Sequence, residues 1–282
     1  MEANPKRVHY YHADVNALGG RISSPFEQVV PTQAPLSLAA SGGYASTHTE
    51  AFELKGILSF KKANSQVAGS VSQKSGGWTT LATVAMEGLN VLDIVTADRV
   101  VVQIATEHPR EGYEPKVSFT GTRFENLRVA GHKIEVELDL ELCSPGGGEK
   151  YPVRPCIQDE HFLTAVAEQR RRMIDERTIP AWQKDKQVPN WVRELYAWDN
   201  SAAQREAQGF VLCTLVKEVK GEFPGKVFGN VLEIPDFGKV FLAELTVDRN
   251  TFRLIGIRLE LGCPVESQTS FTTAAVEGRT HP

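Results

Sequence analysis

The sequence predicts a mainly β protein whose strands form an antiparallel sandwich or a barrel-like sheet. Residues 134–142 alternate strictly, with an apolar residue at every even position and an acidic one at every odd position. On a pleated strand this pattern gives one buried face and one solvated face. Residues 253–261 alternate almost as well, and turn-prone clusters such as residues 41–43 (Ser-Gly-Gly) divide the apolar runs. Many short strands joined by such turns are typical of antiparallel sheets.

Four segments are expected along the chain, with one compact unit as the open alternative. Residues 1–45 are expected to form a long, irregular N-terminal arm or edge segment. Residues 46–156 form a first β half, residues 157–208 a two-helix insert, and residues 209–282 a second β half. The apolar and alternating runs predict strands at residues 52–60, 67–73, 79–86, 99–106, 134–142, 210–216, 239–247 and 253–261.

The insert carries the only helical pattern in the chain. Apolar residues recur at helical spacing from Asp159 to about Arg177, with acidic residues early and arginines late, as the helix dipole favours. Pro180 ends this helix, because proline lacks a backbone N–H. A second, short helix is expected after Pro189, with Asn190 as its N-cap.

Three of the four tryptophans lie in this insert, at Trp182, Trp191 and Trp198. Trp191, Leu195 and Trp198 share one face of the second helix. Tryptophan buries a large area at low entropic cost and is enriched at binding surfaces. The three tryptophans and Leu195 are therefore the candidate binding or interface residues. Packing of the insert on its own sheet would use them equally well.

A weak internal repeat relates the two β halves. Residues 90–94 (Asn-Val-Leu-Asp-Ile) resemble residues 230–234 (Asn-Val-Leu-Glu-Ile), and an apolar strand follows each. Each half then ends on Leu-Glu-Leu and a cysteine, at residues 140–143 and 259–263. Duplication would give two like sheets facing one another, and chance similarity is the alternative.

Two histidine clusters are the candidates for metal or acid–base chemistry. On a strand, His12 and Asp14 share a face and offer an imidazole and a carboxylate to a divalent ion. Glu107 and His108, at a strand end, offer acid–base groups. No second H-x-H and no H-E-x-x-H completes a metal site, so we expect these residues to be structural. We therefore expect no cofactor, no bound metal and no catalytic residue.

Composition restricts the partners. The 31 basic residues against 35 acidic ones give a net charge of −4, without the basic footprint of a nucleic-acid-binding protein. No run approaches the roughly 18 apolar residues of a membrane-spanning helix, and the N-terminal residues do not resemble a secretory signal.

The chain has four cysteines, Cys143, Cys156, Cys213 and Cys263. They allow three disulfide pairings or none, and the sequence does not choose between these states.

Two stretches carry a family resemblance. Residues 13–20 (ADVNALGG) are followed by residues 31–35 (PTQAP) and residues 41–44 (SGGY), and the second stretch covers residues 82–99 (ATVAMEGLNVLDIVTADR). In these motifs the chain resembles bacterial proteins of the choice-of-anchor P family. The resemblance covers less than a third of the chain and implies an extracellular, β-rich surface protein of unknown activity. We expect the chain to depart from the family in its helical insert and in the absence of a signal or anchor segment.

Three functions from different classes follow. The first is a non-enzymatic structural protein that associates with itself into an oligomer or filament, because no complete catalytic motif is present. The second is a module that binds a carbohydrate or another small ligand, with tryptophans as stacking platforms. The third is a metal-dependent hydrolase that uses His12 and Asp14 or the region of His108. The sequence favours them in that order.

Overall fold

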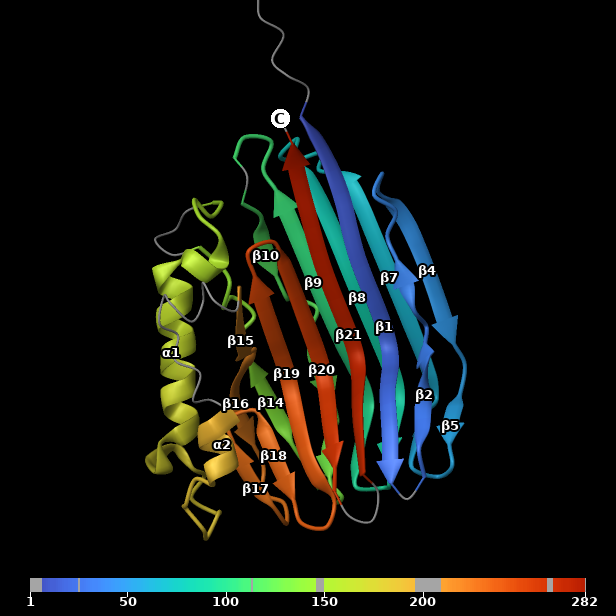
Figure 1. Cartoon of the computed structure of the whole chain (residues 1–282), viewed down its shortest axis with the longest axis vertical. Coiled ribbons are helices and arrows are strands. Elements are labelled where there is room, and N and C mark those ends of the chain that lie inside the picture. Colours follow the sequence, from blue (N-terminus) through green and yellow to red (C-terminus); the bar gives the residue numbers. More distant parts are fainter. Residues whose placement is uncertain are drawn as a thin grey trace, which may run out of the picture.

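The computed structural model describes residues 7–24, 26–112, 114–145, 150–195, 209–262 and 266–281. Two large antiparallel sheets pack against each other as a sandwich (Figure 1), which confirms the predicted fold class. The nine-stranded sheet contains β1 (Val8–Ser24), β2 (Gln28–Gln33), β3 (Leu36–Ser37), β15 (Phe210–Thr214), β17 (Lys226–Phe228), β18 (Val231–Ile234), β19 (Gly238–Asp248), β20 (Thr251–Leu261) and β21 (Glu266–His281).

The ten-stranded sheet is built from the first half of the chain. It contains β4 (Gly43–Thr49), β5 (Phe52–Leu54), β6 (Leu58–Phe60), β7 (Lys62–Val71), β8 (Trp78–Val91), β9 (Val95–His108), β10 (Lys116–Ser118), β11 (Arg123–Glu125), β12 (Arg128–Val129) and β13 (His132–Lys133). A separate two-stranded sheet pairs β14 (Glu135–Leu138) with β16 (Val216–Lys220).

The hydrophobic core lies between the two large sheets. Alternate residues of β9, such as Val102 and Ile104, are fully buried and face buried residues of β20 and β21. The sheets approach each other closely at Gly256, where a Cβ atom would lie 2.8 Å from Cγ2 of Val102 in the opposite sheet. A single hydrophobic cluster extends from Tyr11 to Val276, so the two β-rich halves share one core.

The N-terminal segment is not an irregular arm over residues 8–24, whereas β2 does lie at an edge of the nine-stranded sheet, as the alternative of an edge segment predicts. Residues 8–24 form β1, which pairs along its whole length with β21 and on its other side with β2 and β3. Tyr11, Ala13 and Val15 point inward, while His12 and Asp14 point to the outside. Small and aromatic residues on the buried face obscured the alternation in the sequence.

Two predicted strands are divided or shortened in the structure, and one strand was not predicted. The segment 52–60 is a hairpin of β5 and β6, because Lys55 and Gly56 take positive φ values of 48° and 68° and form a tight turn. The alternating run 134–142 is a strand only over residues 135–138 and then becomes a turn. The long C-terminal strand β21 was not predicted, since its Ser, Thr and Ala residues give a weak apolar pattern.

The two Asn-Val-Leu-acid-Ile motifs are not structurally equivalent. In the first, Leu92 and Asp93 form the turn between β8 and β9, with φ values of 52° and 55°. In the second, the corresponding Leu232 and Glu233 lie within β18, and the turn follows after residue 234. The sequence repeat therefore does not mark a structural duplication at these residues.

Both predicted helices of the insert are confirmed. Helix α1 (Glu160–Ile174) begins after Asp159, whose side chain accepts a hydrogen bond from the N–H of Phe162 at 2.9 Å. It lies between the short 3-10 helices η2 (Cys156–Gln158) and η3 (Glu176–Thr178). Helix α2 (Asn190–Leu195) starts one residue earlier than expected, since Asn190 is already helical.

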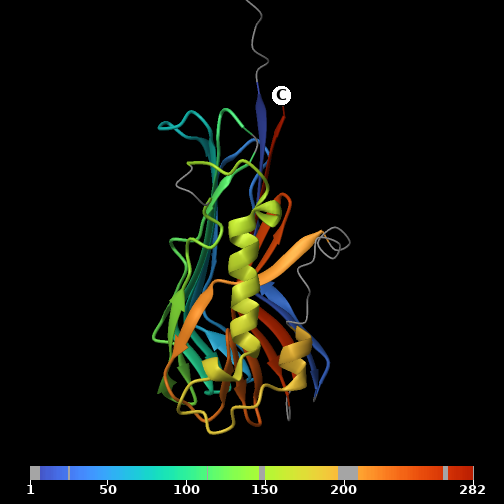
Figure 2. The ribbon, with the colours of Figure 1, turned by 90° about the vertical axis from the view of Figure 1, so that its left-hand side faces the viewer.

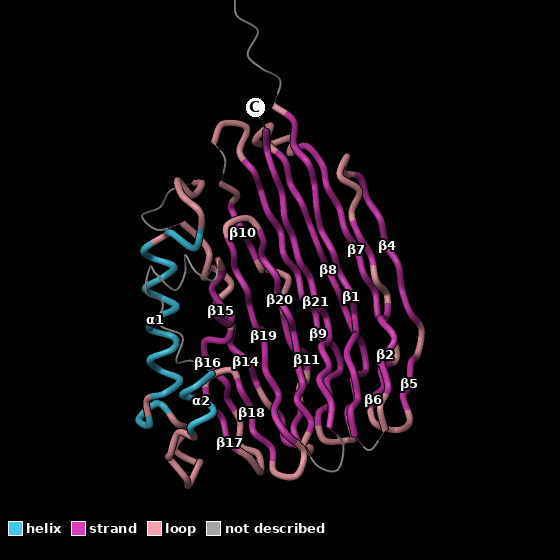
Figure 3. Tube along the Cα trace, viewed as in Figure 1, coloured by secondary structure: helices cyan, strands magenta, loops and turns pink. Residues whose placement is uncertain are grey.

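Helix α1 covers an edge of the nine-stranded sheet. The side-chain amide of Gln169 donates to the carbonyl of Thr214 at 2.7 Å and accepts from its N–H at 3.1 Å. The guanidinium of Arg170 donates to the carbonyl of Leu212 at 3.0 Å. These side chains satisfy backbone groups of β15 that an edge strand would otherwise expose. Figures 2 and 3 show α1 running along this side of the sandwich.

Candidate functional site

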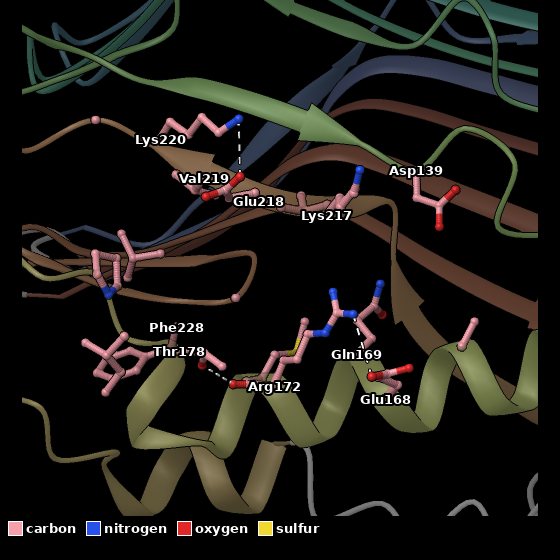
Figure 4. A pocket seen from close by; sticks show the side chains of 18 of the residues that line it. Asp139, Glu168, Gln169, Arg172, Thr178, Lys217, Glu218, Val219, Lys220 and Phe228 are labelled. Atoms are coloured by element: carbon pink, nitrogen blue, oxygen red, sulfur yellow. Dashed lines mark hydrogen bonds and ion pairs between the residues drawn. The ribbon is translucent and has the colours of Figure 1, made fainter.

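A cavity of about 570 Å³ lies between α1 and β16. Figure 4 shows Glu168, Gln169 and Arg172 extending from α1 toward β16, which carries Lys217, Glu218 and Lys220. Its wall is formed by Asp139, Leu142, Ala165, Glu168, Gln169, Arg172, Met173, Thr178, Ile179, Pro180, Trp182, Val216, Lys217, Glu218, Val219, Lys220, Gly221, Val227, Phe228 and Gly229. The wall of the cavity is therefore shared between the helical insert and the strands.

The cavity has an apolar interior and a charged rim. Met173, Ile179, Val219 and Phe228 are buried, and they supply apolar surface to the wall. The charged lining residues number three acidic and three basic side chains, and most of them are exposed: Asp139, Glu168, Glu218, Arg172, Lys217 and Lys220. A wall of this kind fits a ligand with one apolar and one polar side.

The basic residues of the rim already hold carboxylates. Lys217 and Lys220 bind the two oxygens of Glu137 on β14, at 2.7 Å and 3.0 Å. The hydrogen bonds from these two lysines lower the pKa of Glu137 to about 2. Lys220 also contacts Glu218 at 3.2 Å, and Arg172 contacts Glu168 at 3.7 Å. The rim is therefore close to neutral rather than an anion-binding surface.

Polar contacts of the insert fix the shape of the wall. Gln169 is bound to β15 as described above, which sets the rotation of α1. In the segment after α1, the side-chain carbonyl of Gln183 accepts the N–H of Val227 at 3.0 Å, and Asp185 binds Lys226 at 2.6 Å. These contacts attach residues around Trp182 to β17. The cavity is thus bordered on both sides by elements tied to the sheet.

The structure separates the predicted tryptophan sites. Trp182 lines the cavity and its ring centroid lies 5.6 Å from that of Phe223. Trp191 does not line it, but packs edge-on against Phe228 at 5.8 Å, with the ammonium of Lys239 4.1 Å from its ring. Leu195 is half-buried at the end of α2. Trp198 lies outside the described residues.

Comparison with known proteins adds one finding. A family described as "Domain of unknown function (DUF8256)" matches residues 9–248 of the chain. The chain belongs to this family. The match includes every residue that lines the cavity, so the site is part of the DUF8256 region. No curated protein and no solved structure matches. The resemblance to choice-of-anchor P proteins is not addressed by this match and stays a prediction.

The histidine and carboxylate predicted to share a face of a strand do so. On the outer face of β1, Nε2 of His12 lies 3.0 Å from a carboxylate oxygen of Asp14 and Nδ1 lies 3.8 Å from Glu277. Asp14 also accepts a hydrogen bond from the Ser37 hydroxyl at 2.5 Å. His12 and Asp14 are about half-exposed. Across the described ranges, no group of three His, Cys, Asp or Glu side chains is placed to hold a metal ion.

Among the helices that the structure describes, none is long and apolar enough to cross a membrane.

The second predicted histidine is buried between the sheets. His108 is 1% exposed and its Nε2 donates to the carbonyl of Gly278 at 3.2 Å. Its ring lies 4.5 Å from that of His9, which stacks on Trp78 at 5.2 Å. Burial lowers the pKa of both histidines to about 4. This pair is a core feature at one end of the sandwich, away from the cavity.

Sequence reasoning missed most of the cavity. Of β16, only Val216 fell within a predicted strand, at the end of residues 210–216, and the arginines of α1 were assigned only to the late part of a helix. The structure buries Arg170 and places Arg172 on the rim. A signal was present, since Glu168, Gln169 and Arg172 fall on one side of a helix. Their facing strand could not be identified from the chain alone.

Proposed function

We propose that this protein binds a small amphipathic ligand in the cavity between α1 and β16. The observation that carries the proposal is the cavity itself, about 570 Å³, with an apolar interior and a charged rim. Cavities of roughly 300–1,000 Å³ with this lining are typical of small-molecule sites. The ligand class is a neutral or zwitterionic molecule with one apolar face, and sugars belong to this class.

The distribution of polar groups supports this ligand class. The rim offers the carboxylate acceptors of Asp139 and Glu168 and the guanidinium donors of Arg172. Trp182 provides an aromatic ring at the wall, on which the apolar face of a ring-shaped ligand stacks. Because the charges of the rim balance, a strongly anionic ligand would gain little net attraction.

Filling the cavity is expected to abolish binding. We predict that Ala165→Trp, on the wall, weakens the affinity for a ligand at least about tenfold, since the indole occupies space that the ligand needs. Ala167→Trp is the matched control, because Ala167 is exposed on the same helix and does not line the cavity. A panel of mono- and disaccharides and small zwitterions is titrated while tryptophan fluorescence is recorded.

The wild-type protein should respond to at least one class in the panel. The Trp182→Phe variant should lose most of that fluorescence change, and Trp191→Phe should keep it. The proposed function would be overturned if the wild-type protein responds to no member of the panel. It would also be overturned if Ala165→Trp and Ala167→Trp bind the ligand with equal affinity.

A second function, self-association, is supported by one edge of the ten-stranded sheet. Within the described residues, β4 pairs with β7 on one side only. Residues 43–49 contain no Lys, Arg, Asp, Glu or Pro, the residues with which edge strands commonly prevent pairing. Tyr44 on this strand is 68% exposed. We propose that β4 pairs with β4 of a second copy in an antiparallel, two-fold arrangement.

Charging this edge is expected to prevent self-association. We predict that wild-type protein forms dimers or larger assemblies in light scattering as its concentration rises, and that Tyr44→Lys shifts the population to the monomer. Tyr10→Lys is the control, since Tyr10 is 52% exposed on β1, which pairs with β21 along its whole length. A wild-type protein that is monomeric at every concentration contradicts this second proposal and leaves ligand binding untouched.

A further inference from the structure

Three cysteine side chains gather where the helical insert leaves the sheets. Cys143 follows β14, Cys156 begins the 3-10 helix before α1, and Cys213 lies in β15. Cys143 and Cys156 line the same small cavity of about 20 Å³, beside Phe162 and Phe252. All three are free thiols in this structure. Cys263 lies outside the described residues.

Contacts distinguish one pair among the three. Cys143 and Cys156 line the same small cavity, and burial together with the neighbouring Cys156 thiol raises the pKa of Cys143. Cys213 is engaged elsewhere, because its thiol donates to the carbonyl of Leu245 at 3.5 Å. Cys156 is half-exposed, whereas Cys143 and Cys213 are buried at 6% exposure. Of the two thiols that line the small cavity, only that of Cys156 is therefore accessible to a reagent from solvent.

We propose that Cys143 and Cys156 form a reversible disulfide when the protein meets a low-molecular-weight disulfide such as oxidised glutathione. Both residues border the same small cavity, so rotations of the two side chains into it would bring the sulfur atoms to the S–S bond length of about 2.05 Å. The small cavity beside them leaves room for the rotation. Cys213 is not part of the bond.

The reaction balances without another oxidant. The thiolate of the accessible Cys156 attacks the oxidised glutathione and releases one glutathione thiolate, which leaves a mixed disulfide on Cys156. Cys143 then gives up its proton and attacks the Cys156 sulfur, which releases the second glutathione. Two protein thiols are oxidised, one glutathione disulfide is reduced to two thiols, and the two protons go to those products. Burial raises the pKa of Cys143, so we expect the second step to be the slow one.

The bond would join two borders of the ligand cavity. Leu142, next to Cys143, lines that cavity, and Cys156 is followed within a few residues by α1, which forms the opposite wall. A disulfide at this position would fix the start of α1 to the turn after β14. The oxidation state of the pair would thus control how freely the insert moves against the sheets.

Peptide mapping tests the proposal on the whole chain. The protein is incubated with oxidised glutathione near pH 8, the remaining thiols are alkylated, and trypsin digestion follows. Trypsin cleaves after Lys133 and Lys150 but not between Arg154 and Pro155, so Cys143 falls in the peptide 134–150 and Cys156 in the peptide 151–170. We expect these two peptides to be linked and the protein mass to fall by about 2 Da, the two hydrogens lost.

Variants identify the pair. Cys213→Ala should form the same link, and Cys156→Ala should not form it. If a variant fails to fold, the peptide map of the oxidised wild-type protein still shows whether the peptides 134–150 and 151–170 are linked. A link from 151–170 to 206–217, which contains Cys213, or full alkylation of Cys143 and Cys156 after oxidation, would overturn it. Ligand titration is independent of this map, so the proposed function can fail or hold separately.

Discussion

Lowering the pH from 7 to 4 is expected to reduce the free energy of unfolding by about 3 kcal/mol or more through the His9–His108 pair. Burial lowers the pKa of each imidazole from 6.5 to about 4. The charge that His9 would carry disfavours protonation of His108 further. His108 is 1% exposed and His9 is 7% exposed, so we expect the larger share of the effect from His108.

The direction of the effect follows from which state binds the protons. Well above pH 6.5 both histidines are neutral in the folded and unfolded chains, and they contribute no pH dependence. Between pH 6.5 and about 4 the unfolded chain takes up protons that the folded chain does not, so stability falls through this window. The contacts of His108 fit the neutral form, because its Nε2 donates to a backbone carbonyl and needs no second proton.

Urea unfolding at pH 7, 6 and 5 isolates this contribution, since carboxylates with lowered pKa values, such as Glu137 and Asp175, affect stability only at lower pH. We expect His9→Phe, which keeps an aromatic ring against Trp78, to have a smaller fall in stability between pH 7 and 5 than the wild type. His48→Gln is the control, because His48 is 61% exposed. The same pH dependence in all three proteins would contradict the assignment.

The strands that the sequence predicted correctly are those whose pattern is local. β9 and β20 show apolar residues on the buried face, and their partners need not be known to identify them. β1 was missed because its inward residues include His9 and Ala13, and β21 because Ser and Thr fill much of it. Both strands owe their place to each other, since they pair over fifteen positions across opposite ends of the chain. A short stretch of sequence does not show which distant segment it pairs with.

In the candidate site, too, the residues with a local signal were predicted and those that depend on a distant partner were missed. Trp182 was selected from its composition and its position in the insert, and it lines the cavity. Trp191 was selected on the same grounds but packs on Phe228, because α2 turns its face toward β17 rather than into the cavity. The charged residues of β16 were not selected, since they become a site only when α1 lies opposite them. Residue type predicted the candidates, and the packing of α1 decided among them.

Truncating the main apolar contact of α1 is expected to destabilise the protein by about 3–5 kcal/mol. Phe162 is 1% exposed and is the first of four buried positions on α1, with Val166, Arg170 and Met173. Phe162→Ala removes its ring from the shared core and leaves a void next to Phe252 and the cysteine pair. Because the first turn of α1 loses its anchor, the contacts of Gln169 and Arg170 with β15 should also weaken.

Urea unfolding followed by circular dichroism measures the loss, and hydrogen exchange reports whether α1 opens separately from the sheets. Ile174→Ala on the same helix is the matched control, since Ile174 is 38% exposed, and we expect a change within about 0.5 kcal/mol. If α1 is required for the cavity, Phe162→Ala should weaken ligand binding under conditions in which the sheets remain folded. A cost below about 1 kcal/mol would mean that α1 rests on the sheet without anchoring the insert, and the wall of the cavity would then be formed by a helix that moves freely.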